Sequence, residues 1–373
     1  MRHGKPCVDV WMGEVAGLNA RDTRPVGPRG PLVAGVELSS GIARVIVATR
    51  ENSRLRITGR GEAGLAEGAV TGALVVDRES VAAALATAFG AAERGQRTER
   101  SIVAIDGDDV RTYHLSTSFE RESSAAPVAA NEISRATREA ATVTAKTAAA
   151  AAEEDPALRG VPTARLHEDV ASLSLDGRHL ASLVGQRGGL VEVWSDVSVA
   201  PLVLSGAATG SLESVRRRGS VVPGAYALGR LLTESGVLDA GVLRLGADVT
   251  SLAILREGRV VATRSFGLGR IAIASRPDRL EDDARVWADC VVASLHTLDG
   301  LPPARWLFVG VPESLLALPR ALGEAVGGVR GGAVDVTPLS VGLASRAYGD
   351  VQLRADDLVA VGAAAIAAGI YAS

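Results

Sequence analysis

Two short hairpin sequences of similar design decide the fold of this chain. The first is GVELSSG at residues 35–41, where a strand from Leu32 to Glu37 runs into a turn of small polar residues. The second is VLRLGADVT at residues 242–250, where a strand from Gly241 to Leu245 ends in a Gly-Ala-Asp turn. Tight turns of this kind present backbone N–H groups to an anion. Either one alone is an ordinary hairpin turn, but two facing each other across a cleft can hold a triphosphate.

The elements after each hairpin repeat in the same order, which indicates an internal duplication. The first copy continues with strands over 43–49 and 55–61 and with a helix over 79–94 capped by Asp77. The second copy continues with strands over 250–256 and 259–266 and a helix over 280–298. A buried strand over 306–309 and an Ala-rich helix that begins at Leu358 complete it.

The pattern changes between the two copies. From Asp108 a polar strand over 110–119 is followed by a helix over 132–152, with Asn131 as its expected cap, and by strands over 164–175 and 179–184. We interpret residues 108–189 as a small α+β insertion, after which a strand over 190–195 returns to the first domain. The predicted division is therefore a disordered tail (1–31), a first domain (32–107 and 190–236), the insertion, and a second domain (237–373).

Composition limits the classes of function. The 373 residues are 47% hydrophobic and 22% charged with a net charge of −3, as in globular proteins. The arginines are scattered among acidic residues, which disfavours a nucleic-acid surface. Cys7 and Cys290 are too few for a disulfide framework, and the five histidines lack ligand spacing. The longest apolar stretch, 358–371, is shorter than the roughly 20 residues of a membrane span. These features favour a cytoplasmic protein.

The segments and their order resemble the actin, Hsp70 and sugar-kinase superfamily, and most strongly its FtsA branch of bacterial cell-division proteins. Residues 35–41 look like the family's first phosphate loop, G-[LV]-[DE]-I-G-T-[SA], and residues 242–250 stand where its second, D-I-G-G-G-T-T, is expected. Residues 307–310 (LFVG) are similar to the strand and glycine of its adenosine loop. The resemblance covers nearly the whole chain from Leu32.

This resemblance implies an α/β, actin-like (ribonuclease H-like) duplicated fold with an FtsA-type (SHS2) inserted subdomain. In family terms, the first domain is subdomain 1A, the insertion is 1C and residues 237–373 are 2A, with the roof subdomain 2B reduced or absent. The residues it assigns to nucleotide contact are Glu37, Ser39, Ser40, Gly41, Gly246, Asp248, Thr250 and Gly310.

Several positions depart from the family pattern. Arg244 stands where the family has the Asp that positions the metal, and Ala247 and Asp248 replace two glycines of the second loop. A carboxylate pointing at a triphosphate is repulsive unless a cation intervenes. Asp248 and Thr250 therefore either contact metal or phosphate or belong to a solvated turn. Arg244 either forms a salt bridge with Asp248 or Glu37, where the metal would lie, or is exposed.

These departures favour an FtsA-like cell-division scaffold or adaptor with a degenerate nucleotide site, no catalytic residue and no required cofactor. Its expected partners are a tubulin-like division-ring protein or further copies of itself. With no membrane anchor expected in the chain, it would reach the membrane or septum through those partners. Two alternatives remain open. One is an active ATPase or kinase that uses ATP with magnesium and Glu37 as general base; the other is a pilus-assembly adaptor of the PilM type.

Overall fold

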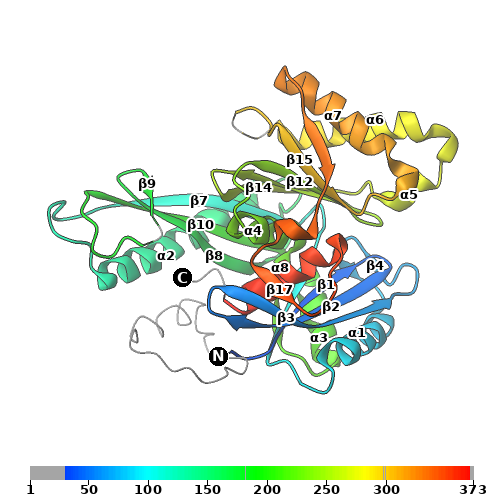
Figure 1. The fold of residues 1–373 in the computed structure, drawn as a ribbon, viewed down its shortest axis with the longest axis horizontal. Coiled ribbons are helices and arrows are strands. Elements are labelled where there is room, and N and C mark those ends of the chain that lie inside the picture. Colours follow the sequence, from blue (N-terminus) through cyan, green and yellow to red (C-terminus); the bar gives the residue numbers. More distant parts are fainter. Residues whose placement is uncertain (1–29, 181, 297, 299, 370–373) are drawn as a thin grey trace.

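The computed structural model describes residues 30–180, 182–296, 298 and 300–369, so the predicted tail lies almost wholly outside it. Three larger sheets and one small hairpin make up the described fold (Figure 1). The first sheet has the order β11-β6-β1-β2-β3-β17. Its strands are β1 (Val33–Ser39), β2 (Ile42–Glu51), β3 (Arg54–Gly64), β6 (Arg100–Ile105), β11 (Gly219–Pro223) and β17 (Ala347–Gly349). The small hairpin pairs β4 (Val70–Thr71) with β5 (Leu74–Val75).

The second half repeats this hairpin design in a five-stranded sheet with the order β14-β13-β12-β15-β16. Its strands are β12 (Ala240–Leu245), β13 (Thr250–Arg256), β14 (Arg259–Phe266), β15 (Arg305–Val309) and β16 (Asp335–Pro338). The predicted bounds of β13 and β14 are confirmed. In both sheets the hairpin strand also pairs in parallel with the strand after the first long helix, as β1 does with β6 and β12 with β15. The duplication read from the sequence is therefore present in the pairing.

Helices separate and cover the two sheets. Helices α1 (Arg78–Glu93) and α3 (Leu202–Ser214) pack on one face of the first sheet. Helices α4 (Gly224–Glu234) and α8 (Leu358–Ala367) lie between the sheets, and α6 (Leu280–Leu295) and α7 (Ala317–Arg330) cover the far face of the second (Figure 1). A Cβ on Gly362 would lie 2.3 Å from the Ala227 carbonyl oxygen, so α8 needs glycine there to approach α4 this closely.

The apolar segment at the chain's end is this central helix. All but one of the residues of α8 are buried against both sheets, as expected for a core helix. Within the described residues, no helix is long and apolar enough to span a bilayer.

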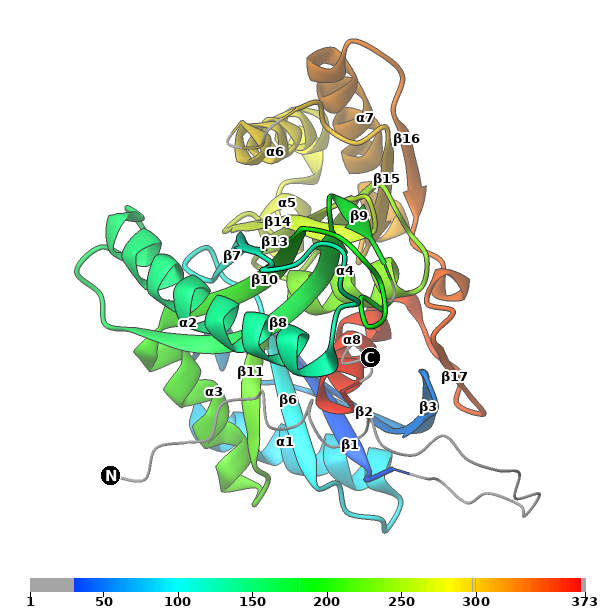
Figure 2. The same cartoon turned by 90° about the vertical axis from the view of Figure 1, so that its left-hand side faces the viewer.

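The inserted subdomain extends to one side of the two halves (Figures 1 and 2). Its sheet has the order β7-β10-β8-β9 and packs against α2 (Ala130–Glu154). The strands are β7 (Arg111–Glu120), β8 (Thr163–Leu175), β9 (Arg178–His179) and β10 (Leu190–Pro201).

The predicted end of the insertion at residue 189 is wrong. Strand β10 does not return to the first sheet but runs between β7 and β8 as a central strand of the inserted sheet. Its alternating valines pack in the two hydrophobic clusters that this sheet forms with α2. Strand β10 (190–201) therefore belongs to this subdomain. The strand expected over 179–184 shrinks to the two residues of β9.

The expected cap of the insertion's helix is also wrong. The cap is Ala129 rather than Asn131, because the Glu132 side chain reaches back to the Ala129 N–H at 3.4 Å. By contrast, Asp77 caps α1 as predicted, and its carboxylate accepts from the N–H groups of Glu79 and Ser80.

Short segments complete the described chain. Between β14 and α6, where a reduced or absent roof subdomain was expected, the chain forms only α5 (Arg270–Ala274) and a 3₁₀ turn (Pro277–Arg279). Three further 3₁₀ turns are Glu313–Leu315, Val341–Leu343 and Ala355–Asp357.

Candidate functional site

The two hairpin turns meet at the carboxyl ends of β1 and β12. The Ser40 hydroxyl of the first turn donates to Asp248 Oδ2 of the second turn at 2.5 Å. The same carboxylate oxygen accepts from the backbone N–H of Gly72, also at 2.5 Å, in the small hairpin beside the first sheet. The Ser40 hydroxyl also lies 2.8 Å from the Val70 carbonyl oxygen. The Ser40 hydroxyl, a predicted nucleotide contact, is thus bound by a carboxylate of the chain itself.

Arg244 makes a second bridge between the halves. From β12 its guanidinium forms an ion pair with Glu37 at the end of β1 and reaches Asp106 Oδ2 at 3.3 Å, just after β6. Only 1% of the Glu37 side chain and 6% of the Asp106 side chain are exposed. Of the alternatives left open by the sequence, Arg244 takes the salt bridge with Glu37, and its second partner is Asp106 rather than Asp248.

Asp106 is a site residue that the sequence analysis did not select. The carboxyl ends of parallel β1 and β6 share one edge of the sheet, which brings Asp106 beside Glu37. Its carboxylate accepts from the Ala225 N–H at 2.9 Å and from the Ser251 hydroxyl at 3.1 Å. Burial raises the pKa of Asp106, while the charge of Arg244 acts in the opposite direction. The sequence did contain a signal for this residue: an acidic side chain directly after a buried strand that was expected to lie in the same sheet as β1.

We call the five residues Glu37, Ser40, Asp106, Arg244 and Asp248 the interdomain latch. Glu37, Ser40 and Asp106 belong to the first half, and Arg244 and Asp248 belong to β12 and to the second turn. The contacts between these two groups join the halves.

A row of charged side chains continues from the latch toward α8. Arg44 on β2 pairs with the second oxygen of Glu37 at 3.1 Å and with Glu62 at 3.1 Å. Arg60 donates to Asp357, at the start of α8, at 2.8 Å. Burial by itself lowers the pKa of Arg44, but the charge of Glu37 and the bond to Glu62 outweigh it and raise the pKa above its usual value. Both oxygens of Glu37 therefore face a cation.

The remaining predicted residues lie around the latch or beneath it. Ser39 is 3.5 Å from the Arg244 guanidinium, and Gly41 takes a positive φ of 84° in the first turn. Gly246 closes the second turn by donating to the Val249 carbonyl at 2.8 Å. Gly310 has a φ of 80°, and a Cβ there would lie 2.4 Å from the Leu245 carbonyl oxygen, so close packing on β12 requires glycine.

Thr250 is placed in the core. It is fully buried, its hydroxyl donates to the Leu268 carbonyl at 2.7 Å, and it accepts from Trp287 Nε1 at 2.9 Å. These two bonds use its hydrogen-bonding capacity toward α6 and the segment after β14 rather than toward the first turn.

The segment after β14 also covers the second turn. The N–H groups of Arg270 and Ile271 donate to the carbonyls of Gly246 and Ala247 at 2.9 and 2.8 Å. An anion bound at this turn would lie close to the Asp248 carboxylate and would be repelled by it. Like charges about 4 Å apart repel by roughly 1 kcal/mol in water and by more in a cleft. No cluster of metal-ligating side chains occurs among the described residues. The described contacts link the two halves through side chains of the chain itself.

Comparisons with known proteins agree on the fold. No family model and no curated protein matches the chain. Among solved structures, the "PilM-PilN type IV pilus biogenesis complex" is similar with a TM-score of 0.62 and 16% identity over 90% of this chain and 98% of that one.

Two further structures match more distantly. The ethanolamine utilization protein EutJ from Carboxydothermus hydrogenoformans has 13% identity over 91% of each chain and a TM-score of 0.44. A Bacteroides thetaiotaomicron protein described as having an actin-like ATPase fold has 10% identity, covers 83% of this chain and 91% of its own, and has a TM-score of 0.39. The chain has the actin-like ATPase fold, as the sequence predicted, while the narrower FtsA assignment stays a prediction.

Proposed function

We propose that this protein is a protein-binding adaptor of the actin-like fold in which the interdomain latch has replaced the nucleotide. The observation that carries the proposal is the double bridge of Arg244 to Glu37 and Asp106, beside the Asp248 carboxylate held by Ser40 and Gly72. In a complex with ATP and magnesium, the phosphate is the anion of the site and the metal is the cation. Here the Asp248 carboxylate takes the place of the anion and the Arg244 guanidinium takes the place of the cation.

The energetics of the latch favour a permanently closed cleft. Removing one member of a buried ion pair leaves an uncompensated charge, at a cost of about 3–5 kcal/mol. Entry of a triphosphate would require the Asp248 and Arg244 contacts to break first and would place further negative charge next to Glu37 and Asp106. ATP and magnesium are therefore not part of the proposed function.

The alternative of an active ATPase or kinase is less well supported. It requires a general base beside the first turn, and Glu37 was the candidate. Both oxygens of Glu37 are bound to guanidinium groups, one to Arg44 and one to Arg244. With both oxygens engaged, Glu37 has no free oxygen directed at a substrate, which argues against its use as a general base.

Two kinds of adaptor remain, a pilus-assembly adaptor and a cell-division scaffold, and we favour the pilus-assembly adaptor. The similar pilus structure is a complex of two proteins, which supports an adaptor in assembly of a pilus-like envelope machine. The inserted sheet β7-β10-β8-β9, with α2 packed against it, supports an FtsA-type SHS2 subdomain. It thereby supports a division scaffold that binds a tubulin-like ring protein or its own copies. In either case the membrane or septum would be reached through the partner.

Equilibrium binding of labelled ATP with magnesium tests the replacement of the nucleotide. We expect no saturable binding and no turnover by the wild-type protein. Micromolar affinity accompanied by hydrolysis would overturn the proposal. Identification of the proteins that co-purify with the chain from its own cells distinguishes the two adaptors, since a pilus component and a tubulin-like protein are readily told apart.

A further inference from the structure

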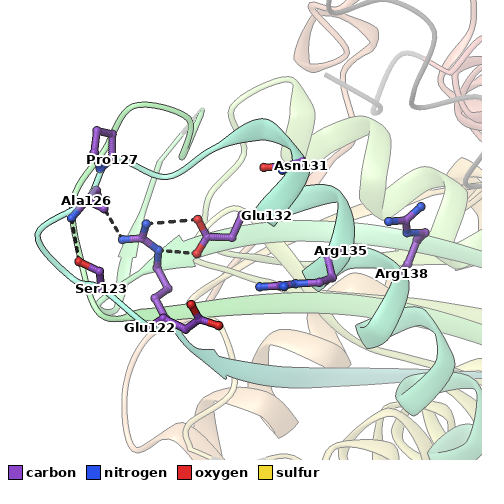
Figure 3. Close-up of a pocket in the computed structure, with 9 residues that line it drawn as sticks. Glu122, Ser123, Ala126, Pro127, Asn131, Glu132, Arg135 and Arg138 are labelled. Atoms are coloured by element: carbon purple, nitrogen blue, oxygen red, sulfur yellow. Dashed lines mark hydrogen bonds and ion pairs between the residues drawn. The ribbon is translucent and has the colours of Figure 1, made fainter.

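A hollow of about 460 Å³ lies in the inserted subdomain, between the loop that follows β7 and the first turns of α2 (Figure 3). Its walls carry Glu122 and Ser123 on the loop and Asn131, Arg135 and Arg138 on the helix. This volume is within the range of ordinary ligand pockets. No latch residue contributes to it.

The floor of the hollow is fixed by Arg121. Its side chain is only 4% exposed and forms a two-point pair with Glu132, with Nε–Oε1 and Nη2–Oε2 distances of 2.6 and 3.2 Å. It also donates to the carbonyls of Gly188 at 2.6 Å and Ala126 at 3.1 Å. The loop is tied further to the chain after β9 by the bond from the Val128 N–H to the Gln186 carbonyl at 2.8 Å. The hollow is therefore formed before any ligand arrives.

The charged side chains around the hollow differ in whether they form salt bridges within the chain. Hydrogen bonding to Arg121 lowers the pKa of Glu132, so that carboxylate is ionised and already neutralised by its own arginine. Arg135 and Arg138, three residues apart on one side of α2, are exposed, and neither guanidinium group forms a hydrogen bond or salt bridge with another described residue. The charge of Arg135 adds a smaller contribution to the lowered pKa of Glu132. The Asn131 amide lies one turn before Arg135 on the same lip. Two guanidinium forks and an amide are thus available for an anion.

We propose that this hollow binds a carboxylate-rich segment of a partner protein, with Arg135 and Arg138 as its anchors. Guanidinium groups bind carboxylates through paired, charge-assisted hydrogen bonds, which gives both affinity and orientation. Glu122 on the opposite wall repels an anion, so the acidic part of the segment lies against α2 and not against the loop. This inference rests on the proposed adaptor function and names the chemistry of its partner.

Fluorescence anisotropy of a labelled hexaglutamate peptide tests the site on the full chain. The wild-type protein binds the probe, and Arg135→Gln with Arg138→Gln weakens binding about tenfold or more. The matched control is Lys146→Gln with Arg159→Gln, which removes the same charge from exposed positions of the same subdomain and changes binding by less than about twofold. Glu122→Gln strengthens binding because it removes the repelling carboxylate.

Three results would overturn the proposal. They are no binding by the wild-type protein, equal weakening by the two double variants, and displacement of the peptide by inorganic phosphate at equal concentration, which marks a site for any small anion. Arg135→Lys with Arg138→Lys keeps the charge but loses the forks, and binding as tight as wild type would also contradict the assignment of paired hydrogen bonds. Failure here leaves the ATP experiment unaffected, because that experiment probes the latch alone.

Discussion

The latch and the hollow on α2 use arginine in opposite ways. In the latch, Arg244 is met by two carboxylates of the chain and is largely buried. At the hollow, Arg121 is met in the same way by Glu132, but Arg135 and Arg138 form no salt bridge with another described residue. A guanidinium that is paired internally joins parts of one molecule, whereas an unpaired one on a preformed surface is available to a second molecule. The comparison separates arginines that link parts of this chain from arginines that we propose bind a partner.

The largest expected effect comes from breaking the latch with Arg244→Ala. Glu37 and Asp106 would remain buried with one cation fewer, and we expect the free energy of unfolding to fall by about 3 kcal/mol. Urea denaturation measures this. The control Arg285→Ala removes an exposed pair with Asp282 and costs at most about 1 kcal/mol. A loss for Arg244→Ala no larger than the control's would show that the latch contributes little to closure.

A somewhat smaller loss in the free energy of unfolding is expected for Thr250→Val. This variant tests whether Thr250, a predicted nucleotide contact, has a structural role instead. The change leaves the Trp287 N–H and the Leu268 carbonyl without their bonds in a buried place, at a cost of about 1–3 kcal/mol. Thermal unfolding checks the size. Unchanged stability together with altered ATP binding would restore the nucleotide role of Thr250.

Asp248→Ala weakens the first bridge of the latch, which joins Ser40 and Gly72 to the second turn. Ser40 and Gly72 lose a charged acceptor at a partly exposed position, so we expect a loss of about 1.5 kcal/mol. The double-mutant cycle of Asp248→Ala with Ser40→Ala isolates their contact. Additive effects of the two changes would mean that the hydroxyl and the carboxylate act independently.

The smallest effect is a difference in pH dependence between the two regions. The folded-state pKa of Glu132 is lowered, so its contribution is present above the usual pKa of 4.5 and is lost as the pH falls through the folded value. The folded-state pKa of Asp106 is raised, so its contribution is present below the usual pKa of 3.8 and declines as the pH rises through the folded value. Unfolding of Glu132→Gln and Asp106→Asn across acidic pH should therefore remove slopes of opposite sign. Slopes of equal sign would contradict this assignment.

Local patterns predicted much of the fold. The strands over 250–256 and 259–266 depend on short apolar runs between turn residues, which are visible in sequence. The Asp77 cap depends on a carboxylate two or three residues before the N–H groups that donate to it, which is also a local feature. The end of the insertion was not predicted, because the place of β10 depends on pairing with β7 and β8 rather than on its own residues. The helix cap at Ala129 was missed since it depends on Glu132, which Arg121 holds from another element.

The sequence by itself determined the duplicated hairpin design and the altered turns, including Arg244 and Asp248, because strand alternation and turn composition are encoded over a few residues. Only the tertiary structure decided how those residues are used. Arg244 and Glu37 are 207 positions apart, Arg244 and Asp106 are 138 apart, and Ser40 and Asp248 are 208 apart. Contacts at such separations follow from the parallel pairing of β1 with β6 and from the packing of α4 and α8 between the sheets. The bridging of the two halves by the chain's own charged side chains is thus a property of the assembled fold.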